Sequence, residues 1–206
     1  MKPITRRALL KYSTAIAGLT AISPAAVAGI LTPRASEGPF YPKPSMRFDD
    51  IDNNLVKVAD AVTEAGGEII LLKGQILSKE GQPLAGHRIE IWQCDVNGIY
   101  LHTGDRRRVT YDNGFQGFGH DITDANGYYR FRTIKPTVYP GRAPHIHVKV
   151  WDREQELLTT QFYIAGYKYN DSDGLFRRMS PEQAEQVSMV FTEHDDVLET
   201  QVDLIV

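Results

Sequence analysis

The sequence has little that would cross-link the chain, anchor it in a membrane or give it an excess of positive charge. Its single cysteine, Cys94, excludes an intramolecular disulfide, and its place in an apolar run predicts a small core residue. With 23 basic and 26 acidic residues the net charge is −3, which excludes the basic footprint of a nucleic-acid-binding protein. The one candidate membrane stretch, residues 12–27, is interrupted by Ser, Thr, Gly and Pro, so we expect no stable membrane anchor.

The first 28 residues resemble an export signal. Arg6 and Arg7 form a twin-arginine pattern, a moderately apolar run follows, and Ala26-Val27-Ala28 is a small-x-small cleavage site. We therefore expect twin-arginine export, cleavage after Ala28 and a periplasmic or secreted mature protein. A frayed N-terminal helix with a chance arginine pair is the alternative. Cleavage would remove four basic residues and no acid, which leaves 19 basic against 26 acidic residues and a net charge of −7.

The remaining chain predicts one well-buried domain, because 206 residues with 42% hydrophobic content are few for two. Residues 29–67 are expected to form an extended arm, since the Pro and Gly residues within 35–52 exclude a regular helix or a central strand. After the arm, short apolar or alternating runs predict strands over 68–77, 87–94, 128–133, 144–151 and 157–164. The turn at 124–127 contains Asn126-Gly127, which favours a hairpin.

Only one good helix is indicated, over residues 181–194. Ser180 is its expected N-cap, Pro181 its first residue, and Gln183 closes a capping box. We place this helix on the surface because it comes late and follows a loop that contains Gly and Asp. Many short strands and one helix predict an all-β fold, a single antiparallel β-sandwich over residues 68–206 with long loops.

The stretch from Tyr139 to Val148 has the most unusual chemistry. His145, His147 and Lys149 alternate with Ile146, Val148 and Val150, a period-2 pattern typical of a strand with one polar and one apolar face. Two residues of strand rise separate the histidine Cα atoms by about 6.6 Å, so two imidazole nitrogens can converge on one metal ion. The simpler alternative is a solvated polar face that binds nothing.

Two tyrosines stand next to turns and are candidates for further ligands. Tyr100 follows an Asn-Gly turn, and Tyr139 lies in a loop bounded by Pro and Gly. A hard trivalent cation can bind a phenol as phenolate, and two phenolates with two imidazoles would leave one net positive charge on Fe(III). Either tyrosine on its own is more simply explained by core packing, since the chain has ten.

A series of motifs in one order resembles the intradiol ring-cleavage dioxygenases, with the protocatechuate type as the nearer likeness. The motifs are Glu37-Gly38-Pro39-Phe40-Tyr41, Trp92-Gln93-Cys94-Asp95-x-x-Gly98-x-Tyr100, Phe118-Gly119-His120-x-x-Thr123-Asp124-x-x-Gly127-Tyr128-Tyr129-x-Phe131-Arg132-Thr133-Ile134-Lys135-Pro136, Tyr139-Pro140, His145-Ile146-His147 and Thr159-Thr160-Gln161-Phe162-Tyr163. The resemblance covers roughly residues 37–163.

The resemblance implies a non-haem Fe(III) enzyme that splits a catechol between its hydroxylated carbons with O2 and yields a muconate-type diacid. Tyr100, Tyr139, His145 and His147 match the iron ligands of the family. Arg142 matches its arginine over the substrate, and Gln161 matches a glutamine near the O2 and substrate pocket. The counterpart of Tyr139 leaves the metal when substrate binds. The expected partners are an aromatic diol and O2, with a homo-oligomer left open.

The sequence departs from the pattern of this family in two places, and two other classes of function stay open. Only five residues separate Tyr139 from His145, where protocatechuate dioxygenases carry a longer loop, and His120 stands where the family usually has Arg. The roles of His120 and His102 and the ring substituents of the substrate stay open. The alternatives are an exported β-sandwich that binds a ligand without turnover, and a metal-dependent hydrolase, which is disfavoured because tyrosine pairs are poor zinc ligands.

Overall fold

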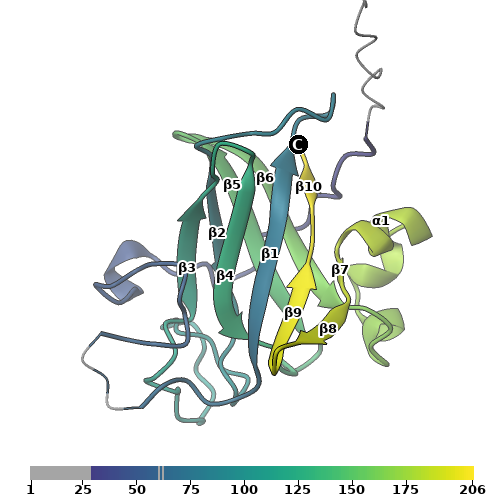
Figure 1. Ribbon diagram of the computed structural model, residues 1–206. Helices are drawn as coiled ribbons and strands as arrows, with labels where there is room; N and C mark the ends of the chain where they lie inside the picture. The colour runs from purple at the N-terminus through teal and green to yellow at the C-terminus, as the bar shows by residue number, and fades with distance from the viewer. Residues whose placement is uncertain (1–28, 60, 62) are drawn as a thin grey trace, which may run out of the picture.

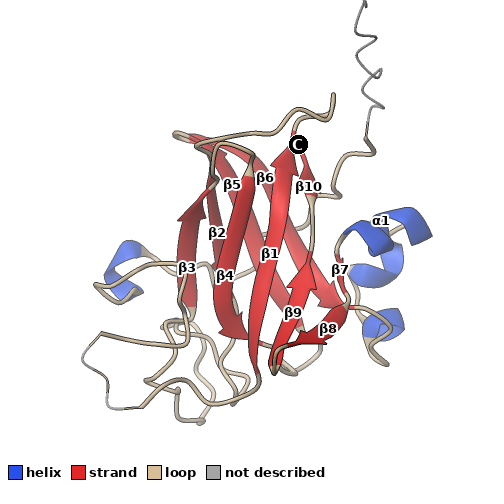
Figure 2. Ribbon diagram, in the orientation of Figure 1, coloured by secondary structure: helices blue, strands red, loops and turns tan. Residues whose placement is uncertain are grey.

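The computed structural model describes residues 29–59, 61 and 63–206, so the predicted signal peptide lies outside the described residues. Within these residues the chain forms ten strands in two sheets, one α-helix and three short 3-10 helices (Figures 1 and 2). The strands are β1 (Ile69–Leu77), β2 (Arg88–Trp92), β3 (Phe118–Ile122), β4 (Tyr128–Ile134), β5 (His145–Asp152), β6 (Gln155–Ile164), β7 (Ser188–Met189), β8 (Phe191–His194), β9 (Val197–Gln201) and β10 (Leu204–Ile205). The helices are α1 (Pro181–Gln186), η1 (Pro44–Met46), η2 (Asn170–Ser172) and η3 (Phe176–Arg178).

The two sheets face each other as a β-sandwich, which confirms the predicted fold class. In the first sheet β1 is central, with β4 on one side, β9 and β10 on the other, and β8 beyond β9; the second sheet has the order β3-β2-β5-β6-β7. The long ladders are antiparallel. The short C-terminal strands add parallel pairs, β9 and β10 against β1 and β7 against β6, which the sequence pattern does not indicate.

The apolar core lies between the sheets, and the alternation of the strands accounts for it. Residues at every second position of β1 and β5 point inward and are fully buried: Ile70, Leu72, Ile76, Ile146, Val148 and Val150. Each such side chain contributes roughly 1.5–3 kcal/mol of burial free energy to folding. The arm adds to the same core, because Leu55 and Val56 are also fully buried in it.

A second, aromatic cluster lies on the other face of the sheet that contains β2 and β5. Its buried members are Trp92, Cys94, Tyr100 and Phe118, with Phe40, Tyr41, Ile51 and Tyr139 packed against them. Cys94 is therefore buried, as predicted. Several of these residues belong to the N-terminal arm, which runs behind β6, β5 and β2 in the view of Figure 1. The arm thus gives this sheet a second covered face.

The helix after Ser180 is shorter than the sequence pattern predicts. The capping box is present, with the Gln183 amide donating to Ser180 Oγ at 3.3 Å, and α1 has no buried residue, as expected of a surface helix. However, α1 ends at Gln186 rather than near His194, and β7 and β8 follow. The residues after α1 pair with the free edge of β6 instead of continuing the helix, and the Tyr163 amide donates to the carbonyl of Val187. Val187 is fully buried at this point.

The turn at residues 124–127 connects two sheets, so the predicted hairpin is wrong. The Asp124 amide donates to the carbonyl of Tyr128 at 3.0 Å, and Gly127 has a φ of +77°, so the turn itself has the expected form. The strands it joins separate at once, since β3 pairs with β2 and β4 pairs with β1. Local turn chemistry is compatible with either outcome, and the pairing of distant strands decides between them.

No helix within the described ranges is long and apolar enough to cross a membrane.

Candidate metal centre

The polar face of β5 is buried rather than solvated. His145, His147 and Lys149 are only 2%, 4% and 3% exposed. The arm, the loop that carries Tyr100 and the loop that carries Tyr139 cover this face of the sheet. The interpretation of the two histidines as a solvated strand face is therefore wrong, and their burial requires partners for their nitrogen atoms.

Three donor atoms meet above β5. Tyr100 Oη lies 3.3 Å from His145 Nε2 and 3.2 Å from His147 Nε2, and the two Nε2 atoms are 3.1 Å apart. We call these three atoms the donor triangle. Two donors about 2.1 Å from one ion and roughly a right angle apart are separated by about 3 Å, so the triangle has the size of one face of a metal coordination sphere.

The chemistry of the imidazoles suits a metal. His145 Nδ1 is 2.7 Å from the carbonyl oxygen of Ala143, which can only accept, so Nδ1 carries the proton and Nε2 presents its lone pair. Burial, aided by Arg142, lowers the pKa of His145 to about 4. Burial also lowers the pKa of His147 well below its usual value, with His145 and Arg142 contributing. Both rings are neutral at physiological pH, as metal ligands must be.

The phenol of Tyr100 can fill the same role when a cation is present. Its ring is buried, and this burial raises the pKa of Tyr100 well above 10, so the side chain on its own stays protonated. His145 Nε2 presents a lone pair to this phenol, whereas no hydrogen bond at Nδ1 fixes the tautomer of His147. A metal ion would bind the Nε2 lone pairs of both histidines and the oxygen as phenolate. The described residues contain no group of three or more His, Cys, Asp or Glu placed to hold a metal.

Asp95 organises the loop that delivers Tyr100. Its side chain is fully buried and accepts from the amides of Asn97 and Ile99 at 2.9 and 3.0 Å, and from the amide of Asp112 at 2.6 Å. Gly98 has a φ of +71°, and a Cβ there would lie 2.6 Å from the carbonyl oxygen of Val138. Only glycine allows this contact, which holds the Tyr100 loop against the Tyr139 loop.

Tyr139 lies beside the donor triangle without joining it. The segment from Tyr139 to Arg142 is a tight turn, with Pro140 and then Gly141 at a φ of +80°, and the Arg142 amide donates to the Tyr139 carbonyl at 3.0 Å. The ring of Tyr139 meets that of Tyr100 edge to face at 5.4 Å. The phenol is only half-buried, so of the four predicted ligands it is the one closest to solvent.

The guanidinium of Arg142 is held in one orientation. Its Nε donates to Asp173 Oδ2 at 2.8 Å, and its Nη2 donates to Gln161 Oε1 at 2.7 Å and to Tyr163 Oη at 3.1 Å. The carboxylate of Asp173 is fully buried, and it also accepts from the backbone amide of Ala143 at 2.9 Å. Burial raises the pKa of Asp173, but these hydrogen bonds outweigh it and leave the pKa below its usual value. The carboxylate is thus ionised and Arg142 has a permanent partner.

Gln161 is placed by the sheet itself. It lies directly opposite His147 in the β5–β6 ladder, and Tyr163 lies opposite His145. Its side-chain oxygen accepts from Arg142 and Tyr163, and its nitrogen donates to the carbonyl of Ser36 in the arm at 2.9 Å. The structure therefore brings Arg142, Gln161 and the two histidines together, and their roles stay predictions.

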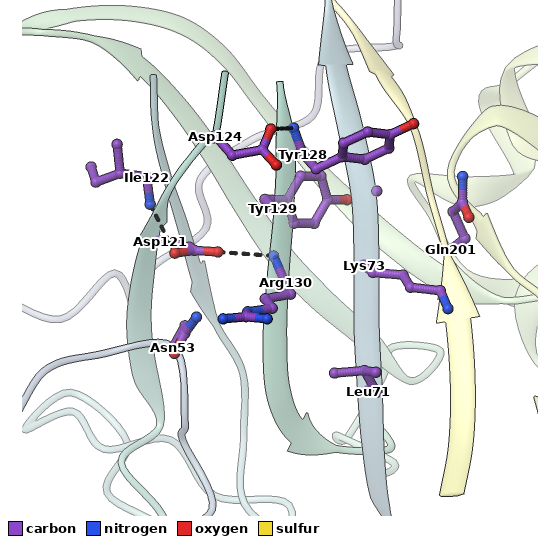
Figure 3. Close-up of a pocket in the computed structure, with 11 residues that line it drawn as sticks. Asn53, Leu71, Lys73, Asp121, Ile122, Asp124, Tyr128, Tyr129, Arg130 and Gln201 are labelled. Carbon is purple, nitrogen blue, oxygen red and sulfur yellow. Dashed lines mark hydrogen bonds between the residues drawn. The ribbon is translucent and has the colours of Figure 1, made fainter. Parts of the chain in front are cut away.

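Two hollows adjoin this site. One of about 300 Å³ is lined by Val138, Tyr139, Gly141, Arg142, Tyr169, Ser172 and Asp173. The other, of about 390 Å³, is lined by Tyr100, His102 and Asp105 among others. A larger hollow of about 590 Å³ lies over β1 and β4 and reaches β3, with Lys73, Tyr128 and Asp121 among the residues that line it (Figure 3). It contains none of the predicted site residues, so size is no guide to the site in this protein.

Several residues of the site escape sequence reasoning. Asp173 belongs to a turn-rich loop, and nothing local links it to Arg142, 31 residues earlier. Tyr163 belongs to one of the family motifs, but the resemblance assigns it no role. His120 of β3 lies opposite Glu90 of β2, and the ring centroids of His102 and Phe40 are 5.6 Å apart. Neither histidine makes a hydrogen bond to the donor triangle in the described part of the chain.

Comparison with known proteins shows the family to which this chain is similar. A family model described as Dioxygenase matches residues 36–205. The chain is 34% identical over 168 residues to the protocatechuate 3,4-dioxygenase beta chain of Burkholderia cepacia, covering 75% of this chain and 71% of that one. It is 31% identical over 166 residues to catechol 1,2-dioxygenase of Acinetobacter baylyi, covering 68% of this chain but only 49% of that enzyme.

The fold also has relatives among solved structures. The dioxygenase domain of a dioxygenase carbohydrate-binding protein fusion from Streptomyces sp. SirexAA-E superposes with a TM-score of 0.65 at 30% identity, covering 86% of this chain and 98% of that one. The mercury-inhibited catechol 1,2-dioxygenase from Acinetobacter sp. ADP1 gives 0.59 at 26% identity, covering 84% of this chain and 62% of that one. The chain therefore belongs to the family of intradiol ring-cleavage dioxygenases.

Proposed function

We propose that this protein is a ferric, non-haem intradiol dioxygenase that opens a catechol-type ring with O2 to a muconate-type dicarboxylic acid. The observation that carries the proposal is the buried donor triangle of Tyr100, His145 and His147, with Tyr139 beside it. Two neutral imidazoles and two phenolates suit Fe(III) better than zinc or magnesium, which rarely take phenolate. When bound, ferric iron would act as a Lewis acid that makes a chelated catechol reactive toward O2.

The protein side chains have separate tasks in this proposal. Burial raises the pKa of Tyr139, so only as the phenolate that bound ferric iron would stabilise could its Oη accept a proton from a substrate hydroxyl. Arg142 lines the hollow next to Tyr139, and its guanidinium stabilises negative charge that develops on the ring. Gln161 and Asp173 hold that guanidinium at fixed distances, so it does not reorganise during the reaction. The buried aromatic cluster around Trp92 and Phe118 keeps water away from the donor atoms.

The test is oxygen consumption by the iron-loaded protein with catechol, protocatechuate and hydroxyquinol. We expect one O2 consumed per diol lost, and labelled O2 should place both oxygen atoms in a ring-opened diacid with no other oxidant or reductant required. Iron-free protein is the control and should consume none. Bound ferric iron with no O2 uptake for any diol would instead favour a module that binds its ligand without turnover.

We also propose that the protein is exported by the twin-arginine route to the periplasm or the medium. Arg6 and Arg7 carry this proposal, and they lie outside the described residues. Changing both to lysine keeps the charge but removes the guanidinium pair that the route recognises. We expect this double variant to remain in the cytoplasm, folded and iron-loaded, when cell fractions are probed for the protein. Normal export of the double variant would mean that another route is used.

A further inference from the structure

The two histidines of the donor triangle are held in different ways. His145 donates its Nδ1 proton to the carbonyl of Ala143 at 2.7 Å, the kind of bond that usually orients a metal-binding imidazole. His147 Nδ1 is buried and has no hydrogen-bond partner among the described residues. Apart from the contacts of its Nε2 within the donor triangle, the His147 ring is oriented by packing.

Trp92 packs on the face of this ring. It lies directly opposite His147 in the β2–β5 ladder, and the two rings are stacked with centroids 4.7 Å apart and only 8° between their planes. The indole is fully buried and meets the ring of Tyr41 edge to face at 4.9 Å, while its Nε1 has no hydrogen-bond partner among the described residues, so packing holds it as well. A near-parallel stack loses contact when either ring tilts, and Trp92 thus restrains rotation of the imidazole.

Gly38 of the N-terminal arm closes the edge of the same ring. A Cβ at this position would lie 3.3 Å from His147 Cε1 and 3.9 Å from Nε2, the atom that belongs to the donor triangle. The φ of Gly38 is +75°, a conformation that other residues rarely adopt. Glycine is needed here both for the backbone and for the space beside His147.

The arm is tied down on both sides of Gly38. On one side the Ala35 amide donates to the Thr159 carbonyl at 2.9 Å, Gln161 donates to the Ser36 carbonyl at 2.9 Å, and Glu37 forms an ion pair with the buried Lys149. On the other side Tyr41 Oη donates to Glu90 Oε2 at 2.7 Å. These contacts use the same outer face of β2, β5 and β6 that carries the histidines, so the backbone of Gly38 has little freedom to move away.

We propose that Trp92 and Gly38 are positioning residues that orient His147 for metal binding, one through the ring face and the other through the ring edge. Together they take the place of the hydrogen bond that His147 lacks. The N-terminal arm is then part of the metal centre rather than a cover for the sandwich. The inference rests on the proposed role of His147 as an iron ligand.

The test compares ferric iron binding in Trp92→Leu, Trp92→Phe and Gly38→Ala with that in the wild type. Loss of an orienting partner typically weakens metal binding roughly 10- to 100-fold, so we expect iron to be lost to a chelator faster by about that factor in Trp92→Leu and Gly38→Ala. Trp92→Phe keeps a flat ring and should stay within a few-fold of the wild type. The electron paramagnetic resonance spectrum of the bound ferric iron should change in the first two variants.

Two matched variants control for simple loss of stability. Gly81 has a φ of +78°, and a Cβ at this position would meet nothing within 4 Å, so Gly81→Ala strains the backbone equally without touching a histidine. Phe131→Leu removes a fully buried aromatic ring from the sandwich core. The thermal unfolding temperature of the iron-free protein should fall in the two control variants as well. The spectra of their bound iron and their iron release rates should match the wild type.

The outcomes separate the two proposals. A wild-type protein that does not hold ferric iron would refute the proposed function itself. Wild-type iron binding combined with unchanged release rates and spectra in Gly38→Ala and Trp92→Leu would overturn the positioning roles. Equal effects in Gly38→Ala and Gly81→Ala would do the same, because they would point to stability alone. Should Trp92→Leu not fold, Gly38→Ala and its glycine control still decide the question.

Discussion

Replacing Arg142 with alanine should lower turnover of the diol substrate by roughly 10²- to 10³-fold while the protein still binds ferric iron. The guanidinium is preorganised by Asp173 and Gln161, and it lines the hollow beside Tyr139. Removing such a fixed positive charge raises the barrier of a reaction in which negative charge develops on the substrate. The measurement is the steady-state rate of O2 consumption, with iron content determined on the same samples.

The same change has a structural cost that must be separated from the catalytic one. Without Arg142 the fully buried carboxylate of Asp173 loses its counter-ion, at a cost of up to roughly 3–5 kcal/mol, moderated by the backbone amides that still donate to it. Adding Asp173→Asn to Arg142→Ala removes the unpaired charge and should recover stability but not turnover. Arg132→Ala, on the other sheet and paired with Glu64, should leave turnover unchanged. Normal turnover in Arg142→Ala would show that Arg142 only stabilises its loop and takes no part in catalysis.

The wild-type protein loaded with ferric iron should be coloured without any substrate, and Tyr100→Phe should remove most of that colour and nearly all activity. A phenolate bound to Fe(III) transfers charge to the metal in visible light, so the absorption band reports the phenolate ligands directly. Tyr100 Oη belongs to the donor triangle, and phenylalanine keeps the ring while deleting this atom. Visible spectra of iron-loaded variants test this expectation.

Tyr139→Phe should behave differently from Tyr100→Phe. Tyr139 lies next to the triangle at a half-exposed turn, which suits a ligand that leaves when substrate binds. Its variant should lose part of the band and still bind catechol without oxygen, yet turn over slowly because the internal proton acceptor is gone. Tyr163→Phe, which deletes a buried hydroxyl outside the triangle, is the matched control for the band. A colourless wild-type protein reconstituted with ferric iron would refute both tyrosine assignments.

The tyrosine and arginine predictions depend on contacts between segments far apart in the chain. Tyr100 precedes His145 by 45 residues, and Arg142 precedes Asp173 by 31. No local pattern links these pairs, because the loops that carry them are placed by the packing of the two sheets and by contacts such as that of Gly98 with the carbonyl of Val138. The family resemblance is enough to predict Tyr100 as a ligand, whereas the contact of Asp173 with Arg142 is found only in the fold.

Features that depend on a few contiguous residues were predictable from the sequence. The alternation around His145 and His147 determines that both imidazoles share one face of a strand, because the side-chain period of a strand is two. The Ser180 capping box determines where α1 begins. The turn from Tyr139 to Arg142 follows from Pro140 and from a glycine that tolerates a positive φ.

Tertiary structure alone decided which surfaces these local elements bury and where they end. The polar face of β5 would be solvated in an isolated sheet, and it is buried here because the arm and two loops cover it. Helix α1 ends at Gln186 because the unpaired edge of β6 binds the next residues more favourably than another helical turn would. Hydrogen bonding and burial between distant segments outweigh propensities of less than about 1 kcal/mol per residue, so neither outcome is encoded in the residues that show it.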